Sequence, residues 1–210
     1  LMGSALFGQS SRQGMSHPDH MEHRLDNPQQ LAKSFDDPAR DAWQMPDRVI
    51  AALGLKQGGI VADIGAGTGY FTVRLAKSDA KPKVYAVDIE PSMVNYLKDR
   101  AAKEGLNNVV AVQAAAETPN LPEPVDVVLL VDTFHHIGGR EVYFRNLAKS
   151  LKPGGKVAII DFRPGVPDGP PKEFHFTPEQ VKSEMSKAGY KLTAQPDFLP
   201  RQQFLIFASR

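Results

Sequence analysis

The chain has 210 residues, with 25 lysines and arginines against 24 aspartates and glutamates, and its formal net charge is +1. A chain of this length can bury about 70% of its unfolded surface in one core, so it needs no metal or disulfide for stability. The near-neutral charge, without a basic stripe, argues against nucleic acid as a partner. The absence of cysteine excludes disulfides, thiolate nucleophiles and thiolate metal sites.

No apolar stretch approaches the roughly 20 residues needed to cross a bilayer, and we expect a cytoplasmic protein with no membrane span. Residues 1–35 are expected to form a flexible, partly tag-like leader ahead of a single domain over residues 36–210. His17, His20 and His23 in this leader have a helical spacing, but Pro18 and the lack of an apolar period argue against a metal site. No metal is predicted elsewhere.

Two short helices are predicted over residues 38–44 and 46–53, before a long alternation of strands and helices begins. From Ile60 onward, runs rich in valine, isoleucine and alanine alternate with segments of helical period, as in a parallel sheet covered on both faces. The predicted strands are 60–64, 83–88, 109–113, 125–131 and 156–162, and the predicted helices between them are 70–78, 91–104 and 140–151.

The pattern changes after the fifth strand. A proline- and glycine-rich loop leads to Thr177-Pro178-Glu179-Gln180, a capping box that predicts a helix ending near Gly189. Strands are then predicted over 190–195 and 203–209, and the short loop between them favours antiparallel pairing at one sheet edge, an edge suited to a homodimer. The predicted fold is a doubly wound, Rossmann-like α/β fold with a seven-stranded, mostly parallel sheet, an antiparallel edge strand and helices on both faces.

The most specific motif follows the first predicted strand, where Asp63-Ile64-Gly65-Ala66-Gly67-Thr68-Gly69 leads into a helix. Glycine permits positive φ and a close approach of the backbone to a ligand, and the new helix presents free N–H groups. Asp63, at the end of the strand, is placed to hold a ligand's ammonium group. Asp88 ends the second strand, where a carboxylate can accept both hydroxyls of a ribose.

These motifs resemble those of the class I S-adenosylmethionine-dependent methyltransferases, and specifically the group of ubiquinone and menaquinone C-methyltransferases. The resemblance covers about residues 36–210 and includes 125–132, similar to the fourth-strand motif, and 151–156, similar to the turn before the fifth strand. It implies S-adenosylmethionine as the cofactor. The residues that it places around the cofactor are Asp63, Gly65, Ala66, Gly67, Thr68, Gly69, Asp88, Ile89 and Met93.

One segment departs from the family pattern. After the third strand many relatives carry an acid that bonds the adenine amino group, whereas this chain has Ala114-Ala115-Ala116-Glu117. Two interpretations remain open. Either Glu117 binds adenine, or it is an exposed loop carboxylate and adenine is held by stacking and main-chain groups.

The acceptor is expected beyond the carboxyl ends of the fourth and fifth strands, where open parallel sheets bind their ligands. His135 and His136 lie there, and histidine is well suited to remove a proton from a hydroxyl or carbon acid near neutral pH. The alternative is that they cap a helix or line the loop. Asp132 is predicted to contact the cofactor.

Four further residues are predicted to line the acceptor pocket: Trp43, Tyr70, Phe134 and Arg163. Trp43 belongs to the helices that close over the cofactor in this family, or it is ordinary core packing. Arg163 either holds an anionic acceptor through its planar guanidinium or is a solvated loop residue.

The predicted function is methyl transfer from S-adenosylmethionine to a small molecule. A quinone precursor, a phenol or a carbon acid is favoured by the resemblance, and a tellurite or selenite oxyanion is also compatible with a cysteine-free chain. Two alternatives remain: an NAD-dependent oxidoreductase, whose glycines are spaced differently, and a non-catalytic protein that binds S-adenosylmethionine.

Overall fold

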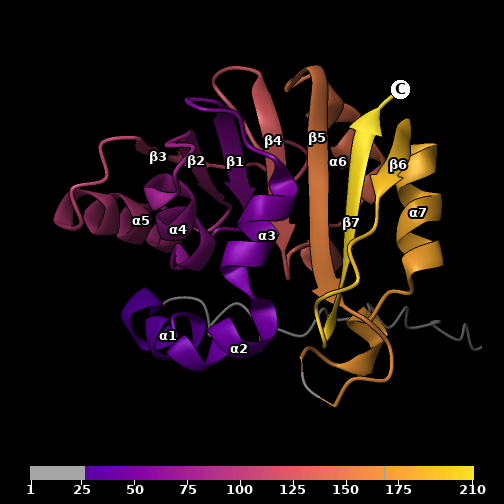
Figure 1. The fold of residues 1–210 in the computed structure, drawn as a ribbon, viewed down its shortest axis with the longest axis horizontal. Helices are drawn as coiled ribbons and strands as arrows, with labels where there is room; N and C mark the ends of the chain where they lie inside the picture. The colour runs from indigo at the N-terminus through magenta and orange to yellow at the C-terminus, as the bar shows by residue number, and fades with distance from the viewer. Residues whose placement is uncertain (1–26, 168) are drawn as a thin grey trace, which may run out of the picture.

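The protein is described by a computed structural model that covers residues 27–167 and 169–210, in which seven strands form one sheet (Figure 1). Their order is β3-β2-β1-β4-β5-β7-β6, and only β7 runs antiparallel to its neighbours. The strands are β1 (Ile60–Ile64), β2 (Lys83–Asp88), β3 (Val109–Gln113), β4 (Val125–Val131), β5 (Leu151–Phe162), β6 (Tyr190–Ala194) and β7 (Gln202–Ser209). The predicted doubly wound fold is confirmed, and the order of the strands reverses between β1 and β4.

Helices cover both faces of the sheet because its central strands are apolar on both sides. On one face, α3 (Pro46–Leu53) and α4 (Tyr70–Lys77) pack on residues such as Val61 and Leu129, and α5 (Pro91–Lys103) lies along β2 and β3. On the other face, α6 (Arg140–Ala148) and α7 (Pro178–Lys187) pack on residues such as Val128 and Ile159. Adjacent residues of one strand thus enter opposite cores.

A third layer lies beyond the carboxyl ends of the parallel strands (Figure 1). It contains α1 (Pro28–Phe35), the 3₁₀ turn η2 (Pro38–Arg40), α2 (Asp41–Gln44), and the loop after β5 with η4 (Lys172–Phe174). The leader predicted over residues 1–35 therefore needs correction, because the Asn27 side chain caps α1 and Pro28 occupies its first turn. His17, His20 and His23 lie outside the described residues.

Two predicted boundaries were wrong around the fifth strand. β5 begins at Leu151, not at Lys156, and α6 ends at Ala148, not at residue 151. The reason is strand pairing: Leu151 pairs with Val125 on β4, and a register shift follows between Val125 and Val127. Residues 152–155, which we assigned to a connection, therefore form an irregularity within β5 between the pairs at Leu151 and Lys156.

In the part of the chain that the structure describes, none of the helices combines the length and the apolar character needed to cross a membrane.

Candidate cofactor and acceptor site

The glycine-rich turn after β1 lies at the point where the strand order reverses. Gly65, Gly67 and Gly69 all have positive φ, at +72°, +55° and +92°. A Cβ added at Gly65 would overlap the side chain of Thr133, so only glycine lets this turn approach the loop after β4 so closely. The backbone N–H groups of Gly65 and Ala66 both donate to the carbonyl of Val87 on β2. The turn is therefore fixed between the two neighbouring strands.

Asp88 faces this turn from the end of β2. One carboxylate oxygen accepts from the N–H of Gly67 at 2.9 Å, and the other accepts from the N–H of Glu90 at 3.0 Å. Burial raises the pKa of Asp88, and these backbone donors oppose the rise. Ile89 follows with 52% of its surface exposed, while Met93 is buried. A carboxylate beside an exposed apolar residue is suited to a ribose diol with an adjoining flat base.

Asp63 points away from solvent at the end of β1. It is buried and accepts a hydrogen bond from the Thr72 hydroxyl at 2.6 Å. Burial raises its pKa to about 6, the Thr72 hydrogen bond opposes the shift, and the charge of Asp88 adds to it. Asp63 thus ties β1 to α4, and its predicted contact with a ligand ammonium group stays a prediction.

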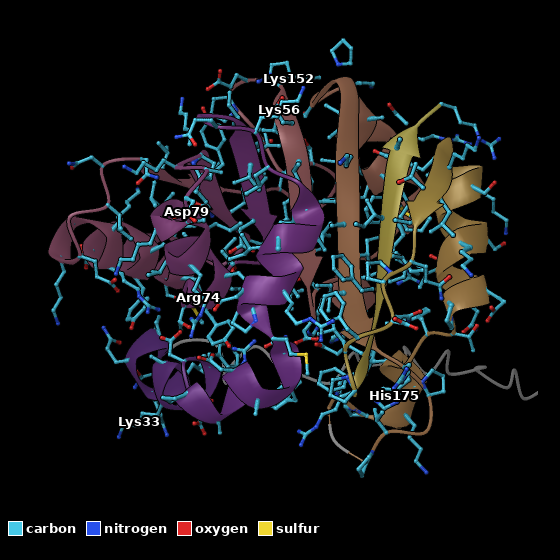
Figure 2. The ribbon with its side chains drawn as sticks, in the orientation of Figure 1. Lys33, Lys56, Arg74, Asp79, Lys152 and His175 are labelled. Carbon is cyan, nitrogen blue, oxygen red and sulfur yellow. The ribbon has the colours of Figure 1, made fainter. Side chains whose placement is uncertain are left out.

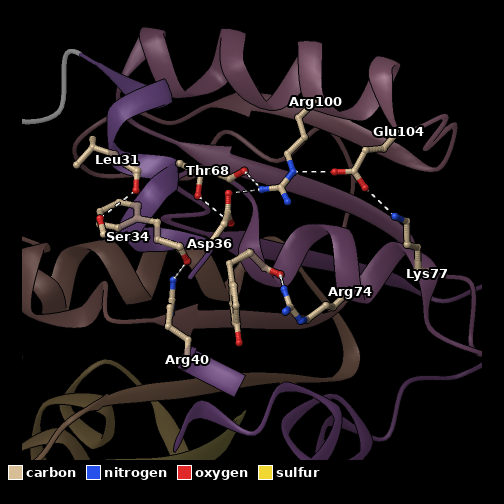
Figure 3. A network of polar contacts seen from close by, with 11 residues as sticks. Leu31, Ser34, Asp36, Arg40, Thr68, Arg74, Lys77, Arg100 and Glu104 are labelled. Carbon is tan, nitrogen blue, oxygen red and sulfur yellow. Dashed lines mark hydrogen bonds and ion pairs between the residues drawn. The ribbon is translucent and has the colours of Figure 1, made fainter. Parts of the chain in front are cut away.

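The amino-terminal segment, residues 27–45, covers the glycine-rich turn. Figure 3 shows the contacts of Asp36 in this segment with Thr68 of the turn and with Arg100. Arg100 of α5 donates through Nη1 to the Asp36 carboxylate at 2.8 Å and to the Thr68 carbonyl at 2.7 Å. The Thr68 hydroxyl bonds the same Asp36 carboxylate at 3.2 Å. The Phe35 ring would lie 3.5 Å from a Cβ at Gly67. These contacts close one side of the site.

Tyr70 takes part in the same closure, and its predicted place in the wall of an acceptor pocket stays a prediction. Its ring lies between the guanidinium groups of Arg40 and Arg74, at 4.1 and 3.8 Å from the ring centroid. Its hydroxyl donates to Asp41, and burial together with this hydrogen bond raises the Tyr70 pKa. The tyrosine therefore joins α4 to the amino-terminal segment.

His135 and Asp161 form a buried pair at the ends of the strands β4 and β5. His135 lies in η3 (Phe134–His136), and its Nδ1 lies 2.9 and 3.0 Å from the two carboxylate oxygens of Asp161. Asp161 also accepts from the backbone N–H groups of His135 at 3.2 Å and Phe162 at 2.8 Å. A proton on Nδ1 donated to Asp161 leaves the Nε2 lone pair free to act as a base.

His136 and Phe134 differ from His135 in their surroundings. The His136 ring is 4.1 Å from the His135 ring, and partial desolvation at this contact, together with the adjacent His135, lowers the pKa of His136. Phe134 is fully buried and packs on Phe144 and Phe176. This packing makes Phe134 part of the core on that face of the sheet, and its predicted place in the wall of an acceptor pocket stays a prediction.

Aromatic side chains gather where β5 ends. The Trp43 and Phe162 rings are 5.8 Å apart, and His175 stacks on Phe162 at 6.3 Å; Figure 2 labels His175 at this end of the strands. Arg201 lies over Trp43, and Arg163 donates to the Pro200 carbonyl at 2.6 Å. Trp43 is half-buried here and contacts both Phe162 and the Arg201 guanidinium.

Glu117 lies apart from this cluster, in the exposed turn after β3. Its backbone carbonyl accepts from Asn146 on α6 at 3.1 Å. The predicted contact of Glu117 with adenine stays a prediction.

The sequence did not single out Gln44 and Gln202, whose buried amides contact the Asp132 carboxylate. Two adjacent glutamines before the apolar run of β7 were the only sequence signal. Among the described residues there is no cluster of three or more histidine, aspartate or glutamate side chains that could hold a metal ion.

Taken with the sheet order, this site defines the class of the protein: a doubly wound α/β protein whose glycine-rich turn and Asp88 are arranged for a nucleoside-containing cofactor. Comparison with known proteins narrows the class. A methyltransferase domain family matches residues 61–155. A solved S-adenosylmethionine-dependent methyltransferase from Aquifex aeolicus is 30% identical, with a TM-score of 0.78, and the match covers 86% of this chain and 97% of that one. The chain belongs to the S-adenosylmethionine-dependent methyltransferases.

Two curated relatives are similar over a shorter region. The 27-O-demethylrifamycin SV methyltransferase of Amycolatopsis mediterranei is 32% identical over 57% of this chain and 44% of its own length. A ubiquinone/menaquinone biosynthesis C-methyltransferase from Ectopseudomonas mendocina is 34% identical over 56% of this chain and 48% of its own length. The match therefore spans about half the length of these curated relatives.

Proposed function

We propose that this protein transfers the methyl group of S-adenosylmethionine to a small molecule whose accepting atom must lose a proton, such as a phenol or a carbon acid of the quinone-precursor kind. The sulfonium of the bound cofactor supplies the activated methyl group. The protein has to align the acceptor for in-line attack and take up its proton.

The observation that carries the proposal is the His135–Asp161 pair, whose histidine lies in the same loop after β4 as Thr133, the residue that meets the glycine-rich turn at Gly65. A buried carboxylate that bonds Nδ1 orients the imidazole and stabilises the imidazolium formed after proton uptake. A cofactor site alone does not require such a pair. The names of the two curated relatives support both oxygen and carbon as accepting atoms, and both atoms release a proton on methylation.

The cofactor residues have separate roles in this proposal. Asp88 accepts the ribose hydroxyls, the turn from Gly65 to Gly69 surrounds the methionyl part, and Ile89 covers the adenine. Trp43 and Phe162 form an aromatic wall on the acceptor side, next to Arg163. Methylation of an oxyanion such as tellurite would use the lone pair of the chalcogen atom and remove no proton, so such an acceptor is less favoured.

Calorimetric titration with S-adenosylmethionine, S-adenosylhomocysteine and NADH tests the cofactor. We expect the first two to bind and NADH not to bind. The Asp88→Ala substitution should weaken S-adenosylmethionine binding by about 2 kcal/mol, or roughly 30-fold, because it removes a charge-assisted contact. Asp79→Ala, which changes an exposed carboxylate before β2, is the control and should leave affinity unchanged (Figure 2).

The acceptor is then sought by following S-adenosylhomocysteine release with phenols, hydroxyquinones and β-dicarbonyl compounds. Each compound is compared with an analogue in which the acidic hydrogen is replaced by a methyl group. NADH binding in place of S-adenosylmethionine would instead favour an oxidoreductase. Strong cofactor binding without turnover of any acidic acceptor would favour a non-catalytic binding protein.

A further inference from the structure

Asp132 lies at the centre of the carboxyl edge, between two buried amides. It is the first residue after β4, and its backbone N–H still pairs with the carbonyl of Ile160 on β5. Its φ of +52° lies in the left-handed region, which is uncommon for a residue other than glycine. The next residue, Thr133, meets the glycine-rich turn at Gly65, so Asp132 lies one residue from that contact.

The two amides come from opposite ends of the chain. Nε2 of Gln202, at the start of β7, donates to one Asp132 oxygen at 2.5 Å. Nε2 of Gln44, at the end of α2, donates to the other oxygen at 3.2 Å. Gln44 and Gln202 are 0% and 2% exposed, so both amides have been removed from water to make these contacts.

The remaining polar atoms of this cluster fix which way each amide faces. Oε1 of Gln44 accepts from Nε of Arg40 at 2.8 Å, and Oε1 of Gln202 accepts from Nε2 of Gln44 at 3.3 Å. Rotating either amide by 180° would place an N–H group against a donor. The two Nε2 groups are therefore directed at Asp132.

Charged and hydrogen-bonding groups on the neighbouring elements act on the same carboxylate. Burial raises the pKa of Asp132 to about 7, and the charge of Asp161 on β5 adds to the shift. Arg40 of η2, the Gln202 amide and His135 of η3 oppose it. Asp132 is thus close to the balance between its two protonation states, and each amide donor favours the charged state.

We propose that Gln202 and Gln44 are positioning residues that keep Asp132 ionised and directed at the cofactor site, and that they thereby set the pH range in which S-adenosylmethionine binds. This inference rests on the proposed function, because it requires that the Asp132 carboxylate attracts the positive charges of the bound cofactor. An ionised carboxylate favours the sulfonium and ammonium groups, whereas a protonated one does not.

The direction of the pH effect follows from this arrangement. S-adenosylmethionine affinity should be high above the Asp132 pKa and should fall as the pH drops through it. Loss of an amide donor destabilises the carboxylate and raises its pKa, so the fall should begin at a higher pH. We expect Gln202→Leu to move the midpoint upward by about one pH unit, and Gln44→Leu to move it less because its contact is longer.

Gln203→Leu is a matched control. Gln203 is the next residue of the same strand and is also buried. It pairs with Asp161 on β5, and its side chain lies on the face of the sheet away from Gln202. Its amide donates to the Phe176 carbonyl at 2.6 Å and does not contact Asp132. Both glutamine-to-leucine changes remove a buried amide, so general damage should affect them alike, whereas only Gln202→Leu should move the midpoint.

Two measurements separate this inference from the proposed function. The first is a carboxyl ¹³C NMR titration of the ligand-free protein, with the Asp132 signal assigned by its loss in Asp132→Asn. The second is the S-adenosylmethionine dissociation constant from pH 5.5 to 9. We expect the Asp132 pKa and the binding midpoint to rise together in Gln202→Leu, and the part of the pH dependence that moves in this variant to disappear in Asp132→Asn, whereas any step from Asp63 should remain in both.

An unchanged Asp132 pKa in Gln202→Leu, or an equal rise in Gln203→Leu, would overturn the positioning role whether or not the cofactor binds. A shifted pKa with tight but pH-independent binding would overturn the contact between Asp132 and the cofactor. No binding by the wild-type protein at any pH would instead overturn the proposed function, and with it the part of this inference that concerns the cofactor.

Discussion

His135 is restrained more tightly than a loop residue requires. Asp161 accepts hydrogen bonds from both its ring and its backbone N–H, and this carboxylate is itself fully buried at the end of β5. A histidine that served only to line a loop would not need a buried charge to orient it, because such a charge is costly to desolvate. The arrangement therefore favours a base over a pocket-lining residue.

Replacing His135 by Gln should lower the turnover of an acidic acceptor by about 100-fold or more, since general base catalysis commonly contributes at least that factor. Affinity for S-adenosylmethionine should change little. Initial rates of S-adenosylhomocysteine release, together with calorimetry, measure the two effects. His136→Gln is the control, because that exposed ring has no hydrogen bond to Asp161 among the described residues. Equal rates in the two variants would return both histidines to a structural role.

At this scale the sequence predicts some site residues well and others poorly. Gly65, Gly67 and Asp88 are recognisable because their local motif contains the strand ends and turns that position them. Gln44 and Gln202 meet only in the folded protein, 158 residues apart in sequence. A buried glutamine carries no sequence signal of its partner, so this part of the site could not be predicted.

Strand positions were predicted more accurately than connections. The predicted bounds of β1 to β4 agree with the structure because each is a short apolar run between turn residues. In contrast, α1 was missed, although Asn27 and Pro28 form a good helix start. Its polar sequence gains stability from contacts with α5 and the glycine-rich turn, and those contacts are tertiary.

The capping box of α7 was predicted from sequence and is present in the structure. The Thr177 hydroxyl accepts from the N–H of Gln180, and the Gln180 side chain accepts from the N–H of Thr177. Thr177→Ala should therefore lower the free energy of unfolding by about 1 kcal/mol in a urea titration. Ser183→Ala, in the exposed middle of the same helix, should change it by only a few tenths. Similar losses in both variants would mean that the cap contributes nothing specific.

The molecule as a whole places its amino-terminal segment, residues 27–45, across the carboxyl edge of the sheet (Figure 1). Arg100 joins this segment to the rest of the protein, because one guanidinium bonds Asp36, the Thr68 carbonyl and Glu104 (Figure 3). The Arg100 and Asp36 side chains are each 21% exposed, so their ion pair is partly shielded from water and salt. Opening the segment has to break the Arg100–Asp36 ion pair and the hydrogen bond from the Thr68 hydroxyl to Asp36, whereas the bonds of Arg100 to Thr68 and Glu104 can remain.

If the segment covers a bound cofactor, Arg100→Ala should favour its open state and speed the release of S-adenosylmethionine. We expect the dissociation rate to rise about tenfold, which corresponds to a loss of about 1.4 kcal/mol. Stopped-flow displacement measures the rate, and limited proteolysis should show faster cleavage within residues 27–45. Lys77→Ala is the control, since Lys77 bonds the same Glu104 from an exposed position but contacts neither Asp36 nor the turn. Faster release in both variants would assign the effect to general loosening of α5, whereas unchanged release in Arg100→Ala would mean that the segment does not limit cofactor exchange.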